Sequence, residues 1–540
     1  MSSRIIDKCA AGLAFLMGLF WVIVPCYWYY VDSIGYMNGF LEPRKYVYLW
    51  HIYHPLFPGP WLWIWTPEEV IKHPMESLYS GGIMISLAGS LGIWATYRWG
   101  RIIGLNIGTS LLAAAGLCGF GAWAYYSTQW AAFIPAISFM LFAFLILVGG
   151  YVGKTGITSD RRPGSLRSIA AGVVLAFATG IHGLVVLALP GFIIALGGEG
   201  RVKRRLYFLA GYFTMLFVIW FMGLMEYHHF SVGGSLSDWL ATSYASEEKF
   251  WVEFQFLHIL QASLMGNIRT LFIGYLWSSL QDDHFKTLDV PIWHNIIKVG
   301  GSIIVPAGFL IYAFALLRGW SSDIHEKGNK ALALVKWGLI SAWFPLAILS
   351  TLYAAYRPHF RLFAWALFWW LLLLLYSRAA SGPRGRMCLL GLTLIVVGLW
   401  SHNYFAGPLL WGDSNRNPYL VESAMISNSY CNTSPVILES NFIGFERAMY
   451  IRLFTPCNFS DMVNRIKGRQ PKYFLSALEH NRSFRITGAA LDELGWQITE
   501  SGELLAGDQG PIAGDVFLGN PKLLSNISTP LGDIYLLGWE

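Results

Sequence analysis

Charged side chains are scarce in this sequence of 540 residues. Asp, Glu, Lys and Arg together make up 13% of the chain, whereas a soluble domain averages about 25%. Hydrophobic residues make up 55%, and the basic residues lie mostly in short clusters between apolar runs. This composition excludes an ordinary soluble protein, gives no indication of nucleic-acid binding despite a net charge of +6, and predicts an integral membrane protein.

Cysteine is also rare, with six residues in the whole chain. Four of them lie in or near apolar runs, where cysteine usually acts as a small core residue. The remaining two, Cys431 and Cys457, are the only pair in the polar C-terminal part. We predict a disulfide between them if that part faces an oxidising compartment. A zinc site is not indicated, because no histidine or cysteine with ligand spacing accompanies them.

A cleavable signal peptide is not indicated either. The first apolar run is long enough to span a bilayer and lacks a small-residue cleavage pattern.

Ten apolar regions are long enough to cross a membrane. One of them, 168–198, is too long for one helix and breaks at Gly180-Ile181-His182-Gly183, which predicts a pair of short helices. With that pair, the chain has about eleven predicted crossings. The other apolar runs are 10–31, 77–97, 103–126, 131–150, 206–226, 297–318, 331–353, 360–377 and 387–403.

Clusters of basic residues lie in alternate linkers between these runs and indicate the orientation of the chain in the membrane. The linkers that carry the most Lys and Arg include 154–167, 201–205 and 378–386, and the positive-inside rule assigns them to the cytoplasm. The N-terminus is then cytoplasmic and the C-terminal part extracytoplasmic. We expect an integral membrane protein, with the bacterial inner membrane as its location.

The chain divides into two predicted domains. Residues 1–403 form an all-α polytopic membrane domain with a first outer loop at 32–76 and a second at 227–296. The second loop carries an aromatic, interrupted stretch at 251–280, for which we predict interfacial or re-entrant helices, and extra crossings within 251–296 stay open. Residues 404–540 form a predicted small extracytoplasmic α/β domain. Its strand-like pieces are Val436-Ile437-Leu438, Tyr473-Phe474-Leu475 and Ile534-Tyr535-Leu536-Leu537.

Ionisable and aromatic residues from separate segments converge on the predicted outer face. Each one alone has a plain structural explanation, since a single buried histidine more often bonds a backbone carbonyl than a ligand. Their common depth nevertheless predicts one cavity near one leaflet. The residues are Asp32, Tyr36, Glu42, His51, His54, His182, Glu226, His228, Arg357, His359 and Arg361.

The segment Arg357-Pro358-His359-Phe360-Arg361 opens an apolar run at this face. Free backbone N–H groups and the dipole at a helix N-terminus attract phosphate, and arginine side chains grip it with paired hydrogen bonds. A lipid that carries a phosphate is therefore a natural substrate, with its head group in the cavity and its tail between helices.

These features resemble the GT-C superfamily of glycosyltransferases, polytopic enzymes that take sugars from polyprenyl-phosphate carriers. The resemblance rests on an acidic residue where the first span ends (Asp32-Ser33-Ile34-Gly35-Tyr36), on His54-Pro55-Leu56-Phe57-Pro58, and on the late arginine segment. It implies an Asp32 general base, Glu42 and Glu226 as alternative carboxylates, and donor-phosphate contacts from Arg357, His359 and Arg361. It also implies inversion at the sugar, a polyprenyl-phosphate-linked donor, and a glycan, lipid or protein acceptor. The first loop lacks an Asp-x-Asp motif, so no cofactor is predicted and dependence on a divalent metal stays open.

Three alternatives share part of this pattern. A transporter or flippase for an anionic lipid-linked substrate would also use buried Arg and Asp, but it predicts internal repeats, and no convincing one is present. A non-catalytic scaffold would not need charged residues that converge on one face. A membrane phosphotransferase would use a nucleophile such as Ser33 beside a metal.

Overall fold

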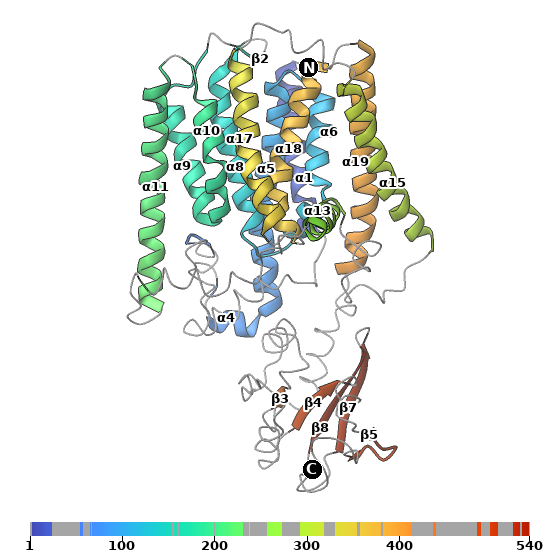
Figure 1. Ribbon diagram of the computed structural model, residues 1–540. Helices are drawn as coiled ribbons and strands as arrows, with labels where there is room; N and C mark the ends of the chain where they lie inside the picture. Colours follow the sequence, from blue (N-terminus) through green and yellow to red (C-terminus); the bar gives the residue numbers. More distant parts are fainter. Residues whose placement is uncertain are drawn as a thin grey trace.

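The computed structural model consists of a bundle of long helices and a small sheet (Figure 1). Figure 1 places the N-terminus at one end of the bundle and the sheet beyond the opposite end. The structure describes residues 3–23, 55–57, 65, 67–153, 156–158, 161–198, 200–230, 237, 256–272, 292–317, 330–353, 357–379, 382–411, 436–438, 483–487, 497–505, 522–529 and 532–538.

The helices account for most of the described residues. They are α1 (Ser3–Ile23), α4 (Pro67–Lys72), α5 (Pro74–Ile102), α6 (Ile107–Cys118), α7 (Gly121–Ser127), α8 (Phe133–Val148), α9 (Ser165–Ile181), α10 (Leu189–Ala195), α11 (Arg201–Phe230), α13 (Phe256–Leu271), α15 (Ile292–Leu317), α17 (Lys330–Leu352), α18 (Pro358–Ala379) and α19 (Gly382–Trp411), with short 3-10 turns η1 (Gly149–Tyr151) and η2 (Gly183–Ala188).

Seven of the described helices are long and apolar enough to cross a membrane, namely α5, α8, α11, α15, α17, α18 and α19. They coincide with seven of the apolar runs in the sequence. The run 103–126 differs from the single straight crossing that its composition predicts, because α6 and α7 meet at an angle of 70°. The larger total of about eleven crossings stays a prediction.

Hydrogen bonds from α19 explain why the chain can bend between α6 and α7 inside an apolar environment. Asn403 donates from its amide nitrogen to the Gly119 carbonyl at 2.7 Å, and Trp400 donates from Nε1 to the Ala115 carbonyl at 2.8 Å. A backbone group released by a helix break at membrane depth needs such a partner within the protein.

The pair of short helices predicted within 168–198 is present. α9 ends at Ile181, the chain turns at the extended residue His182, and η2 and α10 follow. Tyr151 donates to the Ala195 carbonyl at 2.6 Å, and a Cβ on Gly198 would lie 3.6 Å from Nε of Arg162. The residues before α9 and after α10 therefore meet at one end of the bundle, and His182 lies at the other.

Small residues let several helix pairs approach closely. α15 and α19 meet through Gly301 with Gly398 and through Gly308 with Gly391, and a Cβ on Gly301 would lie 2.7 Å from the Gly398 carbonyl oxygen. Close backbone contact at small residues is typical of helix association in membranes, where lipid is as apolar as the side chains.

A four-stranded sheet lies in the C-terminal part of the chain. Its order is β3 (Val436–Leu438), β4 (Ser483–Thr487), β8 (Gly532–Gly538) and β7 (Lys522–Thr529), and only the β3–β4 pair is parallel. A short antiparallel pair, β5 (Gln497–Ile498) and β6 (Leu504–Leu505), lies between β4 and β7 in the sequence. A second short antiparallel pair, β1 (Val152–Gly153) and β2 (Gly156–Ile157), lies in the helical part. The predicted strands at 436–438 and 534–537 are confirmed, whereas 473–475 lies outside the described residues. The domain boundary at 403–404 stays a prediction.

Candidate functional site

Two buried histidines share one aromatic neighbour at the end of the bundle away from the N-terminus. We name His182, His359, Phe133 and Tyr126 the histidine cluster. The His359 ring stacks on Phe133 with centroids 4.2 Å apart, and the His182 ring centroid lies 5.3 Å from that of Phe133. Only 2% of His359 and 4% of His182 is exposed.

Both histidines have hydrogen bonds that fix their rings. His359, in the first turn of α18, has its Nδ1 3.1 Å from the Tyr126 hydroxyl, at the end of α7. His182 accepts a hydrogen bond at Nδ1 from the backbone N–H of Leu184, at 3.2 Å. This bond caps η2 and directs the ring inward from the turn between α9 and η2. Their separate origins make the cluster a junction of α7, α8, α9 and α18.

Part of the first predicted outer loop lies against this junction. The backbone N–H of Leu56 donates to the Gly180 carbonyl, two residues before His182, at 3.0 Å. Phe57 is buried, and its ring centroid lies 5.7 Å from that of Trp130, which precedes α8. Pro55 lies so close to α11 that a Cβ on Gly223 would be 2.8 Å from its Cβ. The middle of the His-Pro-Leu-Phe-Pro motif is therefore held beside His182.

A buried arginine lies one helical turn beyond Arg357 along the chain. Arg361 is 3% exposed and donates from Nη1 to Oδ1 of Asn267 in α13, at 3.3 Å. Trp365, one turn further along α18, donates to the same oxygen at 2.9 Å. The hydroxyl of Thr270 lies 3.3 Å from the Pro358 carbonyl, so α13 packs against the beginning of α18.

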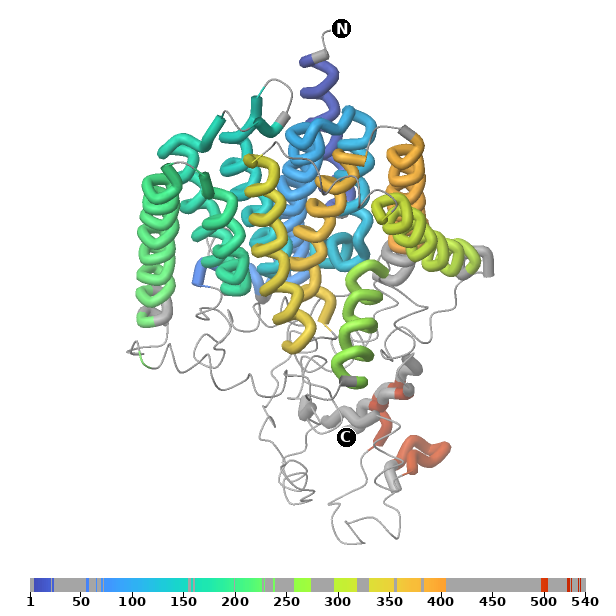
Figure 2. Tube along the Cα trace, turned by 45° about the horizontal axis from the view of Figure 1, so that its top comes forward, coloured from blue at the N-terminus to red at the C-terminus, as the bar shows by residue number. Residues whose placement is uncertain are grey.

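α13 occupies the stretch for which the sequence predicts an interfacial helix. Figure 2 shows it at the end of the bundle opposite the N-terminus. Its C-terminal end is fixed by α19, since Asn403 donates to the Leu271 carbonyl at 2.7 Å and the rings of Phe272 and His402 lie 4.9 Å apart. His402 in turn contacts Ser302 in α15, with Nδ1 and Oγ 2.9 Å apart. Arg361 is thus connected through α13 with α19, and through His402 with α15.

The structure brings together three of the predicted site residues and leaves others apart. His182, His359 and Arg361 are buried at one end of the bundle, and Arg357 is half-buried immediately before α18. His228 is exposed in the last turn of α11, and Glu226 lies in the same turn, with its side chain outside the described part of the structure. Asp32, Tyr36, Glu42, His51 and His54 fall outside the described residues, as do Cys431 and Cys457.

Three residues of the candidate site were not among the site residues predicted from the sequence. Asn267 did give a signal, because it interrupts an aromatic, apolar stretch. Tyr126 and Phe133 gave none, since aromatic residues inside apolar runs are usually core residues. Among the described residues, no group of three His, Cys, Asp or Glu side chains is placed to hold a metal ion.

Comparisons with known proteins identify the architecture. No family model matches the sequence, and no curated protein does. Among solved structures, the chain is similar to ArnT from Cupriavidus metallidurans bound to undecaprenyl phosphate, with a TM-score of 0.56 and 10% identity over 99% of this chain and 97% of that one. The same protein in its apo state gives a TM-score of 0.45 at 10% identity, over 99% and 97% of the two chains. The Archaeoglobus fulgidus oligosaccharyltransferase in the apo form gives 0.47 at 12% identity, over 96% of this chain and 76% of that one. The first match extends over nearly the whole of both chains and shows a shared fold.

Proposed function

Since this chain has the GT-C fold of ArnT, we propose that it is an integral membrane glycosyltransferase. It transfers a sugar from a polyprenyl-phosphate-linked donor to an extracytoplasmic glycan, lipid or protein. The N-terminus is cytoplasmic, and the reaction takes place at the opposite end of the bundle, where the histidine cluster lies.

The observation that carries this proposal is the meeting of three distant segments at one end of the bundle. The loop residues 55–57, the turn at His182 and the beginning of α18 lie around Phe133 and Trp130. A scaffold needs no buried His and Arg at such a junction, because ionisable groups in a membrane domain are costly to bury. A binding site for a charged head group uses them.

The donor phosphate is assigned to the beginning of α18. Arg357 lies immediately before α18, and Arg361 lies in the first turn of that helix. Arg357 is half-buried, so it can reach a ligand that arrives from the membrane, whereas Arg361 is held in place by Asn267. In a glycosyl transfer from a lipid phosphate, negative charge builds up on the leaving phosphate oxygen, and cations placed beforehand stabilise it.

Asp32 is assigned as the general base. In the proposed reaction, an acceptor hydroxyl attacks the anomeric carbon, its proton passes to the Asp32 carboxylate, and the bond from that carbon to the phosphate oxygen breaks. The transition state resembles an oxocarbenium ion, as in glycoside hydrolysis. One displacement inverts the anomeric centre. The support for this assignment is the position of Asp32 in the loop whose residues 55–57 lie beside His182.

A turnover assay with membranes and a radiolabelled polyprenyl-phosphate sugar tests the proposal. Asp32→Asn should lower transfer by about a hundred- to ten-thousandfold, since this is the usual contribution of a general base. Donor binding should persist, because Asn keeps the size of Asp and the proton is transferred only as the bond forms. Glu42→Gln and Glu226→Gln are matched controls.

Two outcomes would redirect the proposal. If Glu42→Gln or Glu226→Gln is inactive while Asp32→Asn is not, then the base is a different carboxylate and the glycosyltransferase stands. If the wild type moves the intact lipid across sealed vesicles without transferring sugar, then the protein is a transporter.

A further inference from the structure

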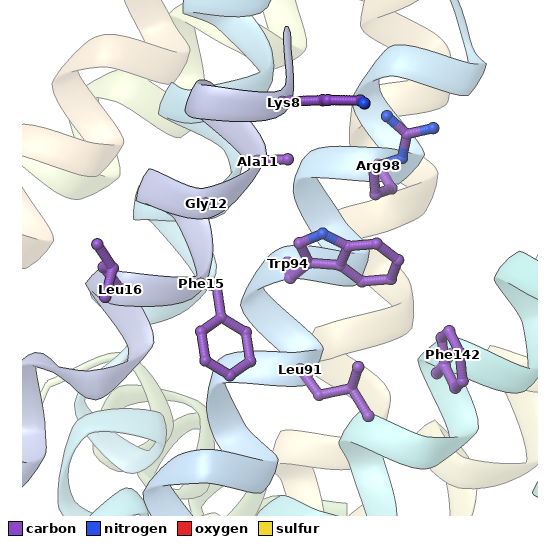
Figure 3. Close-up of a pocket in the computed structure, with 9 residues that line it drawn as sticks. All are labelled: Lys8, Ala11, Gly12, Phe15, Leu16, Leu91, Trp94, Arg98 and Phe142. Atoms are coloured by element: carbon purple, nitrogen blue, oxygen red, sulfur yellow. The ribbon is translucent and has the colours of Figure 1, made fainter. Parts of the chain in front are cut away.

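A groove lies between α1, α5 and α8, at the end of the bundle away from the histidine cluster. It has a volume of about 780 Å³. Figure 3 shows Lys8 and Arg98 at one end of the groove, with their cationic groups on the same side, and apolar side chains along the rest. The lining residues are Lys8, Ala11, Gly12, Phe15, Leu16, Leu91, Trp94, Arg98 and Phe142.

The charged end of the groove carries an excess of positive charge. Asp7 accepts hydrogen bonds from Arg98 at 3.1 Å and from Arg101 at 2.7 Å, and from the Tyr97 hydroxyl at 2.8 Å. One carboxylate thus stands against three cations, Lys8, Arg98 and Arg101. Asp7 fixes the two arginines in place but leaves a net positive charge that favours an anion.

The remainder of the groove is apolar and continues along α1. Trp94 and Phe142 form an edge-to-face pair with centroids 6.0 Å apart. Leu16 lines this groove and also a second one of about 680 Å³, whose lining residues carry no charge: Leu13, Leu16, Met17, Leu19, Phe20, Val22, Ile23, Ile83, Leu87 and Trp400. Leu13 and Leu16 are 51% and 60% exposed, as expected of a surface that faces acyl chains.

We propose that this surface binds an anionic phospholipid from the leaflet at the N-terminal end of the bundle, with the phosphate between Lys8 and Arg98 and an acyl chain along Trp94 and Leu16. Charge at one end and apolar walls along the rest match a lipid better than a free anion, which would use the charged end alone. Basic residues at this depth place their charge at the head-group level while their stems contact apolar surface. The site is separate from that of the proposed donor.

Native mass spectrometry of the detergent-solubilised protein tests the proposal. Phosphatidylglycerol and phosphatidylcholine with identical acyl chains are titrated separately, and phosphatidylglycerol should bind more tightly. Lys8→Gln should weaken phosphatidylglycerol binding about fivefold, which is the usual effect of one basic residue near an anionic membrane surface. Lys203→Gln is the matched control, because it removes the same charge from an exposed residue of α11 in a different part of the bundle.

A second variant tests the apolar part without changing charge. Gly12 lines the groove, and a Cβ on it would meet no atom within 4 Å, so Gly12→Phe is the variant chosen to place a ring in the groove. It should lower the binding of phosphatidylglycerol at least as much as Lys8→Gln does. Equal binding of the two lipids, or unchanged binding in both variants, would overturn the proposal. Competition by inorganic phosphate that abolishes lipid binding would also overturn it, because the site would then recognise the anion alone.

Discussion

The Tyr126 hydroxyl lies 3.1 Å from Nδ1 of His359, although 233 positions separate the two residues in the sequence. Tyr126 belongs to the short helix after the bend in the first half of the chain, and His359 to the first turn of a late helix. Their contact joins the two halves of the bundle at the point where the proposed donor site begins. A change at either residue should therefore affect both the stability of this junction and the reaction.

Tyr126→Phe removes the hydroxyl and keeps the ring that packs on Phe133 and His359. We expect a loss of about 0.5–1.5 kcal/mol in the free energy of unfolding, the usual net value of one hydrogen bond. Denaturant unfolding in detergent measures the loss. Tyr207→Phe, on the half-buried part of α11, is the control. In combination with His359→Ala, the effect of Tyr126→Phe should shrink, and strictly additive losses would contradict the contact.

Adjacent glycines of α15 offer a matched test of the packing against α19. A Cβ on Gly301 would lie 2.7 Å from the Gly398 carbonyl oxygen and 3.0 Å from the backbone nitrogen of His402, whereas a Cβ on Gly300 would meet nothing within 4 Å. Gly301→Ala should lower the free energy of unfolding by about 1–3 kcal/mol, because the added methyl group overpacks the interface. Gly300→Ala should raise it by up to about 1 kcal/mol, because alanine has the higher helix propensity. Equal melting temperatures of the two variants would contradict this arrangement of α15 and α19.

The sequence predicted the main helices and one of the two breaks for a local reason. Gly180, His182 and Gly183 interrupt an apolar run, and the chain turns there. The bend at Gly119 could not be predicted in this way, because its stabilising partner Asn403 lies 284 positions away. Local patterns reveal where an apolar helix is interrupted, but not which distant side chain satisfies a released carbonyl.

The same distinction applies to the candidate site. His182, His359 and Arg361 are visible in the sequence because ionisable residues in apolar segments are rare. Phe133 holds the two histidines together, yet its position follows only from the packing of α8 against α9 and α18. Pattern analysis therefore finds the polar members of such a site and misses the aromatic residue that joins them.

Membrane orientation gives a prediction that the proposed function depends on. Single cysteines at Lys154, Lys203 and Arg204 should react with a membrane-impermeant reagent only from the cytoplasmic side, since the positive-inside rule assigns their linkers to the cytoplasm. Arg204 is buried and donates to the Gly197 carbonyl, so Lys203 is the better position for quantitative labelling. Labelling of these positions only from outside would place the histidine cluster on the cytoplasmic face and contradict the proposed site of reaction.

The cysteine pair of the C-terminal part gives a prediction about its compartment. Cys431 and Cys457 lie outside the described residues, and we expect them to form a disulfide on the oxidising side of the membrane. An alkylating reagent added to the unreduced, denatured protein should modify only the other cysteines, which intact-mass measurement would reveal. Modification of all six cysteines without prior reduction would exclude the bridge.

Arg357, immediately before α18, and Arg361, in its first turn, should respond differently to substitution, because they have different surroundings. Arg357→Ala removes a half-buried cation assigned to a phosphate that is already present in the bound donor. It should weaken donor binding by about 1.5–3 kcal/mol, the usual value of a hydrogen bond to a charged group, and should also slow transfer, since the same charge stabilises the leaving phosphate.

Arg361 is instead fully enclosed and bonded to Asn267, so Arg361→Lys keeps the charge but loses the fixed guanidinium geometry. Asn267→Ala should reproduce part of the Arg361→Lys effect on transfer and leave Arg357 untouched. Binding of the radiolabelled donor and single-turnover transfer rates separate the two roles. If Arg357→Ala binds donor as the wild type does, while Asn267→Ala and Arg361→Lys do not, then the phosphate lies deeper along α18 than proposed and Arg361 is its main contact.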